Sequence, residues 1–164
     1  MKNQLIVYYG GGEGKTSAAI GHAIRASKYG KVGIIQFMKK RETGERILKK
    51  FKNIDFYNFG KKTFFPAKKK SHREEVKKAF ELAVKFLSKK YFLVILDEIL
   101  YALEFNLLKE KDLLNLLENR KCHVIITGKK AGKKVLKIAN IVTEFKKKKH
   151  HYDKDKKTIR GIDF

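Results

Sequence analysis

A glycine-rich loop near the N-terminus carries the residue types that bind phosphate. Residues 10–17 read GGGEGKTS and stand between an apolar run and a helical pattern. Glycines let the backbone approach an anion and adopt positive φ, and the amides that begin a helix donate hydrogen bonds to phosphate. A lysine adds positive charge, and a threonine hydroxyl can bind Mg²⁺. This context predicts a phosphate-binding loop rather than an empty glycine turn, and its members are Gly10, Gly11, Gly12, Glu13, Gly14, Lys15 and Thr16.

The loop is one residue shorter than the usual pattern, G-x-x-x-x-G-K-[ST]. That pattern needs a glycine five residues before Gly14, where this chain has Tyr9, and the nearest match is Gly10. A shorter loop should wrap the phosphates differently. The spacing therefore favours nucleotide chemistry other than ordinary cleavage of the γ-phosphate.

Two adjacent carboxylates follow the longest apolar run of the chain. Asp97 and Glu98 come directly after Leu93-Val94-Ile95-Leu96. In phosphate-loop enzymes such a strand is expected next to the first strand, so that its terminal acid faces a metal beside the loop threonine. Mg²⁺ takes hard oxygen ligands and keeps several waters, so one or two carboxylates suffice, and Mn²⁺ has similar preferences. We expect a metal on Thr16, Asp97 and Glu98; the alternative is that Asp97 only caps the next helix.

Apolar runs alternate with helical patterns along the whole chain, and these elements must position the two motifs. We predict strands at residues 4–9, 32–38, 54–59, 91–97, 123–127 and 141–145, and helices at 15–28, 43–51, 71–88, 98–104, 109–119 and 130–139. Thr43 is predicted to cap the second helix, and Ser71 with Glu74 forms a capping box for the third. The alternation implies an α/β fold of the phosphate-loop, RecA-like type, in which helices flank a mainly parallel sheet in three layers. Ligands of such folds bind at the carboxyl ends of the strands.

The length of 164 residues suits a single domain. We expect a nucleotide-binding domain over residues 1–145 and a basic tail over residues 146–164 that contributes to the rim of the same site. No apolar run approaches the ~20 residues that span a bilayer, and none near Met1 resembles a signal peptide. The single cysteine, Cys122, cannot form an internal disulfide. These features predict a soluble, cytoplasmic protein.

The formal net charge is +23, from 40 basic and 17 acidic residues. Lysine and arginine release counterions from phosphate backbones, so nucleic acid is one candidate partner and a solvated basic surface is the plainer explanation. The basic excess avoids residues 91–120, which hold three basic and six acidic residues, including the acidic pair. A phosphate-loop ATPase or nucleotide-binding module that binds nucleic acid through its basic surface is therefore the alternative hypothesis.

Several further motifs occur in a specific order and spacing. They are GIIQFMK at residues 33–39, GER at 44–46, LDE at 96–98 followed by YAL at 101–103, HVIITG at 123–128, ANIVTE at 139–144, KH at 149–150 and GIDF at 161–164. Together with the shortened loop GGGEGKTS, they resemble the phosphate-loop type of corrinoid (cobalamin) adenosyltransferase. The likeness covers nearly the whole chain, and it lies in the shared order of the motifs rather than in any single one.

The resemblance implies a homodimeric transferase of cobalamin biosynthesis or salvage. Members of that family transfer the 5′-deoxyadenosyl group of ATP to cobalt(I) of a reduced corrinoid and release tripolyphosphate. They hold ATP in the reverse sense to most phosphate-loop enzymes, which agrees with the short loop. Cobalt(I) is already a strong nucleophile, so the enzyme has to align the 5′ carbon and stabilise the leaving group rather than supply a base. A flavoprotein reductant is implied by the need for cobalt(I).

The resemblance also implies roles for the two motifs. Lys15 and Glu98 are the expected catalytic residues. Lys15 and the amides of residues 10–14 would stabilise the triphosphate, with Mg²⁺ held on Thr16 and Glu98. Asp97 would hold a metal-bound water.

Four further residues are expected to contact the substrates. Ser17 lies at the phosphate site by analogy with the loop of the family. Arg25, ten residues after Lys15, matches an arginine of the family, and we expect it to contact the nucleotide. Phe64 and Phe65 stand where the family carries an aromatic motif, and they would either form a wall against the corrin ring or only anchor their loop. The W-E-T-Q part of that motif is absent, so a nucleotide or corrinoid carrier without turnover is a third hypothesis.

Two histidines near the C-terminus belong to neither motif. His150 and His151 lie in a run of mixed charge. A metal site and a pair of exposed histidines are both compatible with that run, and the second is the commoner situation.

Overall fold

The computed structural model describes residues 3–39, 43–60 and 69–163, and it shows an α/β fold in three layers. The strands of the described residues are β1 (Leu5–Tyr9), β2 (Val32–Gln36), β3 (Ile54–Asn58), β4 (Leu93–Asp97), β5 (His123–Gly128) and β6 (Ile141–Glu144). The helices are α1 (Lys15–Ala26), the 3₁₀ helix η1 (Gly44–Lys50), α2 (Lys69–Leu87), α3 (Ile99–Glu104), α4 (Glu110–Glu118), α5 (Lys133–Ile138) and α6 (Tyr152–Asp155).

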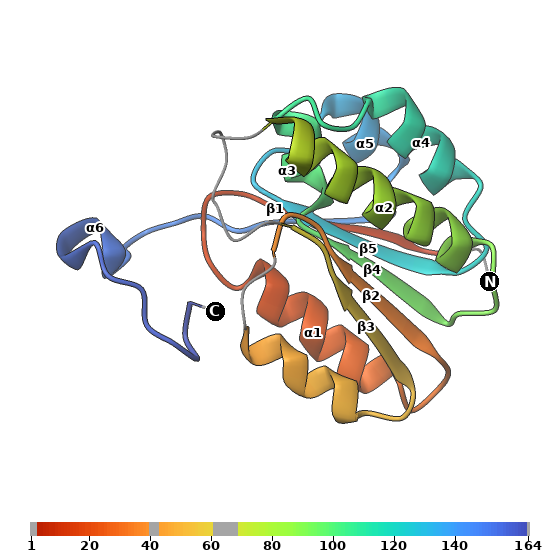
Figure 1. Ribbon diagram of the computed structural model, residues 1–164, viewed down its shortest axis with the longest axis horizontal. Coiled ribbons are helices and arrows are strands. Elements are labelled where there is room, and N and C mark those ends of the chain that lie inside the picture. The colour runs from red at the N-terminus through yellow and green to blue at the C-terminus, as the bar shows by residue number, and fades with distance from the viewer. Residues whose placement is uncertain (1–2, 40–42, 61–68, 164) are drawn as a thin grey trace.

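The strands form one parallel sheet in the order β3-β2-β4-β5-β1-β6. Every residue of β2 and β4 is buried, as the continuous apolar runs predict for strands covered on both faces. One face packs against α1 and η1, and the other packs against α2, α3, α4 and α5 (Figure 1). The predicted fold class, a parallel sheet between helices, is confirmed.

The strand that carries the acidic pair does not lie next to the first strand, so that expectation is wrong. β5 lies between them, because Val124 pairs with Leu5 on one side and with Val94 on the other. β1 and β4 are therefore about 10 Å apart, two strand spacings. The phosphate loop still reaches β4, because α1 crosses the sheet over β5 and β4.

Two predicted helix caps are wrong in detail. α2 already includes Lys69 and Lys70, so Ser71 lies inside the helix and does not begin it. Thr43 does occupy the cap position of η1, but its side chain makes no capping hydrogen bond. Its hydroxyl is buried without a hydrogen-bond partner among the described residues. The segment is a 3₁₀ helix, in which the Arg46 amide donates to the Thr43 carbonyl.

The C-terminal tail follows β6 and extends beyond the carboxyl edge of the sheet, on the side of the phosphate loop (Figure 1). Apart from α6 it has no regular structure within the described residues. Phe145 joins it to the loop, because its carbonyl accepts the Gly12 amide at 2.7 Å. No described helix is long and apolar enough to cross a membrane.

Candidate functional site

The phosphate loop joins the end of β1 to the start of α1. Its conformation depends on glycine at two positions, Gly10 with φ 119° and Gly14 with φ 94°. A side chain at Gly10 would also collide with the Phe145 carbonyl. Gly14 precedes the first turn of α1, and its carbonyl accepts the Ala18 amide at 2.8 Å. The amides of the first turn have no partner within the helix and are the natural donors to an anion.

Two amides of the loop are used to hold the loop in place. The Gly10 amide donates to the Lys129 carbonyl at 2.9 Å, and the Gly12 amide donates to the Phe145 carbonyl at 2.7 Å. The Lys15 ammonium donates back to the Gly12 carbonyl. Burial lowers the pKa of Lys15 below its ordinary value. The loop is thereby fixed to the segments after β5 and β6, and two of the amides predicted to bind the triphosphate, those of Gly10 and Gly12, are already paired.

Asp97 ends β4 as a buried carboxylate, with 1% of its side chain exposed. It accepts hydrogen bonds from Thr16 Oγ1 at 3.0 Å and from Thr127 Oγ1 at 2.6 Å. Gln36 Nε2 donates to its second oxygen at 3.0 Å. The donors come from α1, β5 and β2, so three separate elements hold one carboxylate beside the phosphate loop.

Glu98 follows Asp97 in a left-handed conformation, with φ 63° and ψ 15°. That conformation costs a non-glycine residue about 1 kcal/mol, and such residues cluster at functional sites. Its amide donates to Thr127 Oγ1 at 2.8 Å. Burial raises the pKa of Glu98 to about 7; Lys39 opposes the rise and Asp97 adds to it.

Lys39 lies at the centre of the cluster. Its Nζ is 3.3 Å from Glu98 Oε1, 3.5 Å from Asp97 Oδ2 and 3.4 Å from Thr16 Oγ1. Burial by itself would lower the pKa of this ammonium, but the Asp97, Glu98 and Glu45 carboxylates hold it above its ordinary value. Glu45 lies at 4.0 Å and keeps one buried oxygen without a partner among the described residues.

This donor set fits Mg²⁺. The oxygens of Thr16, Asp97 and Glu98 converge on the position that the Lys39 ammonium occupies, and hard oxygens are the ligands that this ion prefers. Lys39 pairs with Asp97, Glu98 and Glu45, and the Lys15 ammonium acts on Asp97 and Glu98 as well, yet one buried oxygen of Glu45 has no partner among the described residues. The residues are therefore suited to hold a divalent cation beside the loop.

A cavity of about 1050 Å³ opens in front of these residues. Its polar wall contains Gly11, Gly12, Glu13, Gly14, Lys15, Thr16, Ser17, Lys39, Glu45, Glu98, Tyr101 and Thr127. Its apolar wall, between α1 and η1, contains Ile20, Ile24, Ile47, Leu48 and Phe51. The tail contributes Lys147, His150, Tyr152, Asp153, Thr158, Gly161, Ile162 and Asp163. The volume lies just above the usual range of about 300–1,000 Å³ for ligand sites, so the cavity is large enough for a nucleotide.

The structure does not bring every predicted residue to this cavity. Arg25 is exposed in the last turn of α1, about 15 Å along the helix from Lys15, and is not among the lining residues. Gly10 supports the loop from behind and is not part of the lining either. Phe64 and Phe65 lie outside the described residues.

Four polar residues of the cluster lie in motifs that carry the family resemblance, but the sequence predicted no site role for them. Gln36 and Thr127 each stand at the carboxyl end of a buried strand, and Lys39 follows β2 closely. Glu45 lies in η1, within the GER motif at residues 44–46. A polar residue at the end of an apolar run was the available signal, but its meaning depends on which strands are neighbours.

The comparison with known proteins agrees with this geometry. A family model described as ATP:corrinoid adenosyltransferase BtuR/CobO/CobP matches residues 1–164. The corrinoid adenosyltransferase of Escherichia coli strain K12 is 32% identical over 166 residues, covering 98% of this chain and 85% of that protein. The corrinoid adenosyltransferase CobA of Salmonella typhimurium is 34% identical over 170 residues, with coverage of 98% and 85%. That of Pseudomonas aeruginosa is 31% identical, with coverage of 98% and 83%. The chain therefore belongs to the ATP:corrinoid adenosyltransferase family.

Proposed function

We propose that this protein transfers the 5′-deoxyadenosyl group of ATP to the cobalt(I) centre of a reduced corrinoid. The cobalt electron pair attacks the 5′ carbon, a cobalt–carbon bond forms, and the bond from that carbon to the triphosphate oxygen breaks. Tripolyphosphate leaves with the bonding electrons. The observation that carries the proposal is the hydrogen bond from Thr16 to Asp97, which joins the phosphate loop to the acidic pair beside one cavity.

The residues of the polar wall act on the leaving group in this proposal. The amides that begin α1 and the Lys15 ammonium bind the triphosphate, where negative charge accumulates as it departs. Thr16, Asp97 and Glu98 would hold Mg²⁺. When bound, Mg²⁺ neutralises phosphate oxygens and so makes the tripolyphosphate a better leaving group. Ser17 lines the same part of the cavity and contacts phosphate.

The apolar wall and the tail act on the other half of the reaction. Ile20, Ile24 and Phe51 offer a surface for the flat, weakly polar parts of the substrates. Residues 146–164 form the rim of the same site, with the nucleotide-binding domain over residues 1–145. Phe64 and Phe65 either face the corrin ring or anchor their loop. Arg25 contacts a nucleotide only if ATP in this cavity extends toward the end of α1, or if ATP bound to a partner subunit reaches that end of the helix.

Three further features are proposed from the family resemblance. ATP lies in the reverse sense to most phosphate-loop enzymes, which the shortened loop supports; electron density from a crystal soaked with ATP would decide this. The active form is a homodimer, which light scattering on the purified protein would measure. A flavoprotein supplies the electrons that generate cobalt(I), and reconstitution with a purified flavodoxin would test that step.

The central experiment is anaerobic incubation with ATP, Mg²⁺ and a chemically reduced corrinoid. We expect the absorption spectrum of a cobalt–carbon bond and one tripolyphosphate for each product molecule. Lys15→Ala and Glu98→Ala should each lose turnover and keep the fold, with the exposed substitution Lys85→Ala as the matched control. Orthophosphate and ADP in place of tripolyphosphate would instead indicate an ATPase, and bound corrinoid without product would indicate a carrier.

A further inference from the structure

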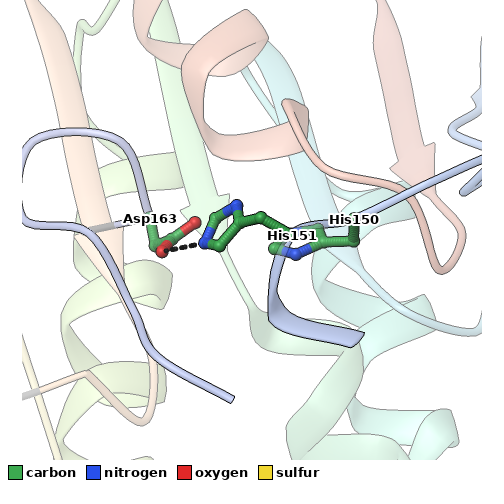
Figure 2. Close-up of side chains that lie close together, drawn as sticks. All are labelled: His150, His151 and Asp163. Atoms are coloured by element: carbon green, nitrogen blue, oxygen red, sulfur yellow. Dashed lines mark hydrogen bonds and ion pairs between the residues drawn. The ribbon is translucent and has the colours of Figure 1, made fainter. Parts of the chain in front are cut away.

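Three potential metal ligands of the tail come together although the sequence separates them. His150 and His151 begin a loop that returns at Asp163, and Figure 2 shows the three side chains side by side. His151 Nε2 lies 3.1 Å from Asp163 Oδ2, and one ligand atom from each residue lies within 4.8 Å of the others. The two imidazole rings are 4.6 Å apart between centroids. The return of the chain thus builds a compact cluster of two imidazoles and a carboxylate.

Asp163 has a buried oxygen that the described protein atoms leave unsatisfied. Only 8% of its side chain is exposed. Oδ2 accepts from His151 and from the Ile159 amide, whereas Oδ1 has no hydrogen-bond partner among the described residues. A buried carboxylate oxygen without a partner is costly, so this position is suited to a cation.

His150 is oriented by a carboxylate from the phosphate loop. Its Nε2 lies 2.8 Å from Glu13 Oε1, and its Nδ1 accepts the Tyr152 amide at 3.0 Å. A carboxylate on one ring nitrogen fixes an imidazole and raises the basicity of the other nitrogen, as is usual for histidines that bind metals. Because Nε2 is paired with Glu13, Nδ1 is the atom of His150 that would bind the metal. It would give up its hydrogen bond from the Tyr152 amide to do so.

We propose that His150, His151 and Asp163 bind a divalent transition-metal ion of the zinc class. Two imidazole nitrogens and one carboxylate oxygen suit Zn²⁺ and its neighbours better than Mg²⁺, which prefers oxygen ligands alone. The site is therefore chemically distinct from the cluster of Thr16, Asp97 and Glu98. Side-chain rotation closes the present spacing to the ~3.3 Å between ligands that Zn–N bonds of about 2.0 Å require.

The metal would have a structural role at the wall of the cavity. His150 and Asp163 line the cavity, and the chain between them carries four exposed basic residues: Lys154, Lys156, Lys157 and Arg160. A metal that bridges the two ends closes this loop and reduces the conformations open to it. Through Glu13 the closed tail is also connected to the phosphate loop.

The first test measures binding of Zn²⁺ in competition with a chromophoric chelator, with excess Mg²⁺ to occupy the oxygen cluster. We expect one tight Zn²⁺ per chain, and at least tenfold weaker binding by His151→Gln and by Asp163→Asn. Asp153→Asn is the matched control in the same tail, because Asp153 pairs with Lys147 at the surface. Equal Zn²⁺ affinity in wild type and both ligand variants would overturn the proposal. The measurement needs neither ATP nor corrinoid, so it is independent of the proposed transferase activity.

The second test measures trypsin cleavage after the four basic residues. Zn²⁺ should slow this cleavage severalfold in the wild type and in Asp153→Asn, but leave His151→Gln unaffected. Because every sample contains the same Zn²⁺, inhibition of trypsin itself cannot produce the difference. His151 is 31% exposed, so its replacement by glutamine should not unfold the domain, and circular dichroism will verify this. Equal protection in His151→Gln would contradict the assigned ligands.

Discussion

The Asp97 carboxylate shows how single side chains position the site. It is buried and accepts hydrogen bonds from Thr16, Gln36 and Thr127, each of which lies on a different element. Thr127 serves both acids, because its hydroxyl donates to Asp97 and accepts the Glu98 amide. One threonine at the end of β5 therefore orients the acidic pair.

Replacement of this threonine tests that role. Thr127→Val keeps the shape of the side chain and removes both hydrogen bonds. We expect a loss of about 1–3 kcal/mol in the free energy of unfolding and a fall of about tenfold in the apparent affinity for Mg²⁺. Urea denaturation and a Mg²⁺ titration of turnover measure the two effects. Thr143→Val, on the exposed strand β6, is the control; similar values for both variants would exclude a positioning role for Thr127.

Lys39 is the second residue that the site depends on. Its ammonium lies between the acids and Thr16, where it balances their charge. Lys39→Met should cost about 3 kcal/mol in the absence of Mg²⁺, because it leaves buried carboxylates uncompensated. Mg²⁺ should restore more stability to Lys39→Met than it adds to the wild type, since the ion no longer competes with an ammonium.

Thermal unfolding with and without Mg²⁺ measures this difference. Lys85→Met removes an exposed lysine from α2 and is the matched control. If Mg²⁺ shifts the unfolding temperatures of Lys39→Met and wild type equally, Lys39 does not occupy the position of the ion.

At the scale of elements, the sheet depends on apolar runs that are legible in the sequence. All six predicted strands occur. The central strands β2 and β4 gave the clearest signal, because residues buried on both faces of a parallel strand must be apolar. The helix boundaries shift by a few residues, since local capping competes with tertiary packing. The order of the strands was not accessible, because the buried strands β1, β2, β4 and β5 are all apolar and nothing in their sequences specifies which of them pair.

Because the sequence does not specify the strand order, it predicts only part of the site. The loop, Asp97 and Glu98 carry chemical signals in their own motifs. Gln36, Lys39 and Thr127 are single polar residues, and they acquire meaning only when β2, β4 and β5 lie side by side. A wrong neighbour for β4 therefore hid its partners without affecting the prediction of the acid itself.

A hydrogen bond joins β3 to the segment that precedes β4, and it makes the stability of the sheet depend on pH. Tyr91 donates to Asp55 at 2.5 Å, and Lys31 pairs with the same carboxylate at 2.8 Å. Burial would raise the pKa of Asp55, but these two partners lower it below 3.8. A depressed folded-state pKa contributes stability above the unfolded value and loses it as the pH falls through the folded value.

Tyr91→Phe isolates this contribution, because the ring keeps its stacking on Phe86. At pH 7 we expect the variant to be less stable by about 1–2 kcal/mol. The difference should begin to shrink as the pH falls below about 4, where unfolded aspartate becomes protonated, and vanish below the lower folded-state pKa at which Asp55 becomes protonated in the wild type. Urea denaturation at several pH values measures it, and a difference that stays constant down to pH 2 would contradict the assignment to Asp55.

At the scale of the whole molecule, the net charge of +23 exceeds what a nucleotide site requires. Exposed lysines gather on and beside α5, where the group comprises Lys129, Lys130, Lys133, Lys134 and Lys137. This surface is separate from the lining of the cavity. It is suited to attract polyanions without taking part in adenosyl transfer.

Binding to DNA should therefore be unspecific, steep in salt and irrelevant to turnover. A protein that neutralises about six phosphates loses about 10³-fold in affinity between about 50 and about 200 mM salt. Fluorescence anisotropy with duplexes of different sequence should give equal affinities and a steep salt slope, and the triple variant Lys133→Gln, Lys134→Gln, Lys137→Gln should flatten that slope. Because these three residues do not line the cavity, the variant should transfer adenosyl groups at the wild-type rate. DNA-stimulated release of orthophosphate, lost in the same variant, would instead make this basic surface part of a nucleic-acid-dependent ATPase.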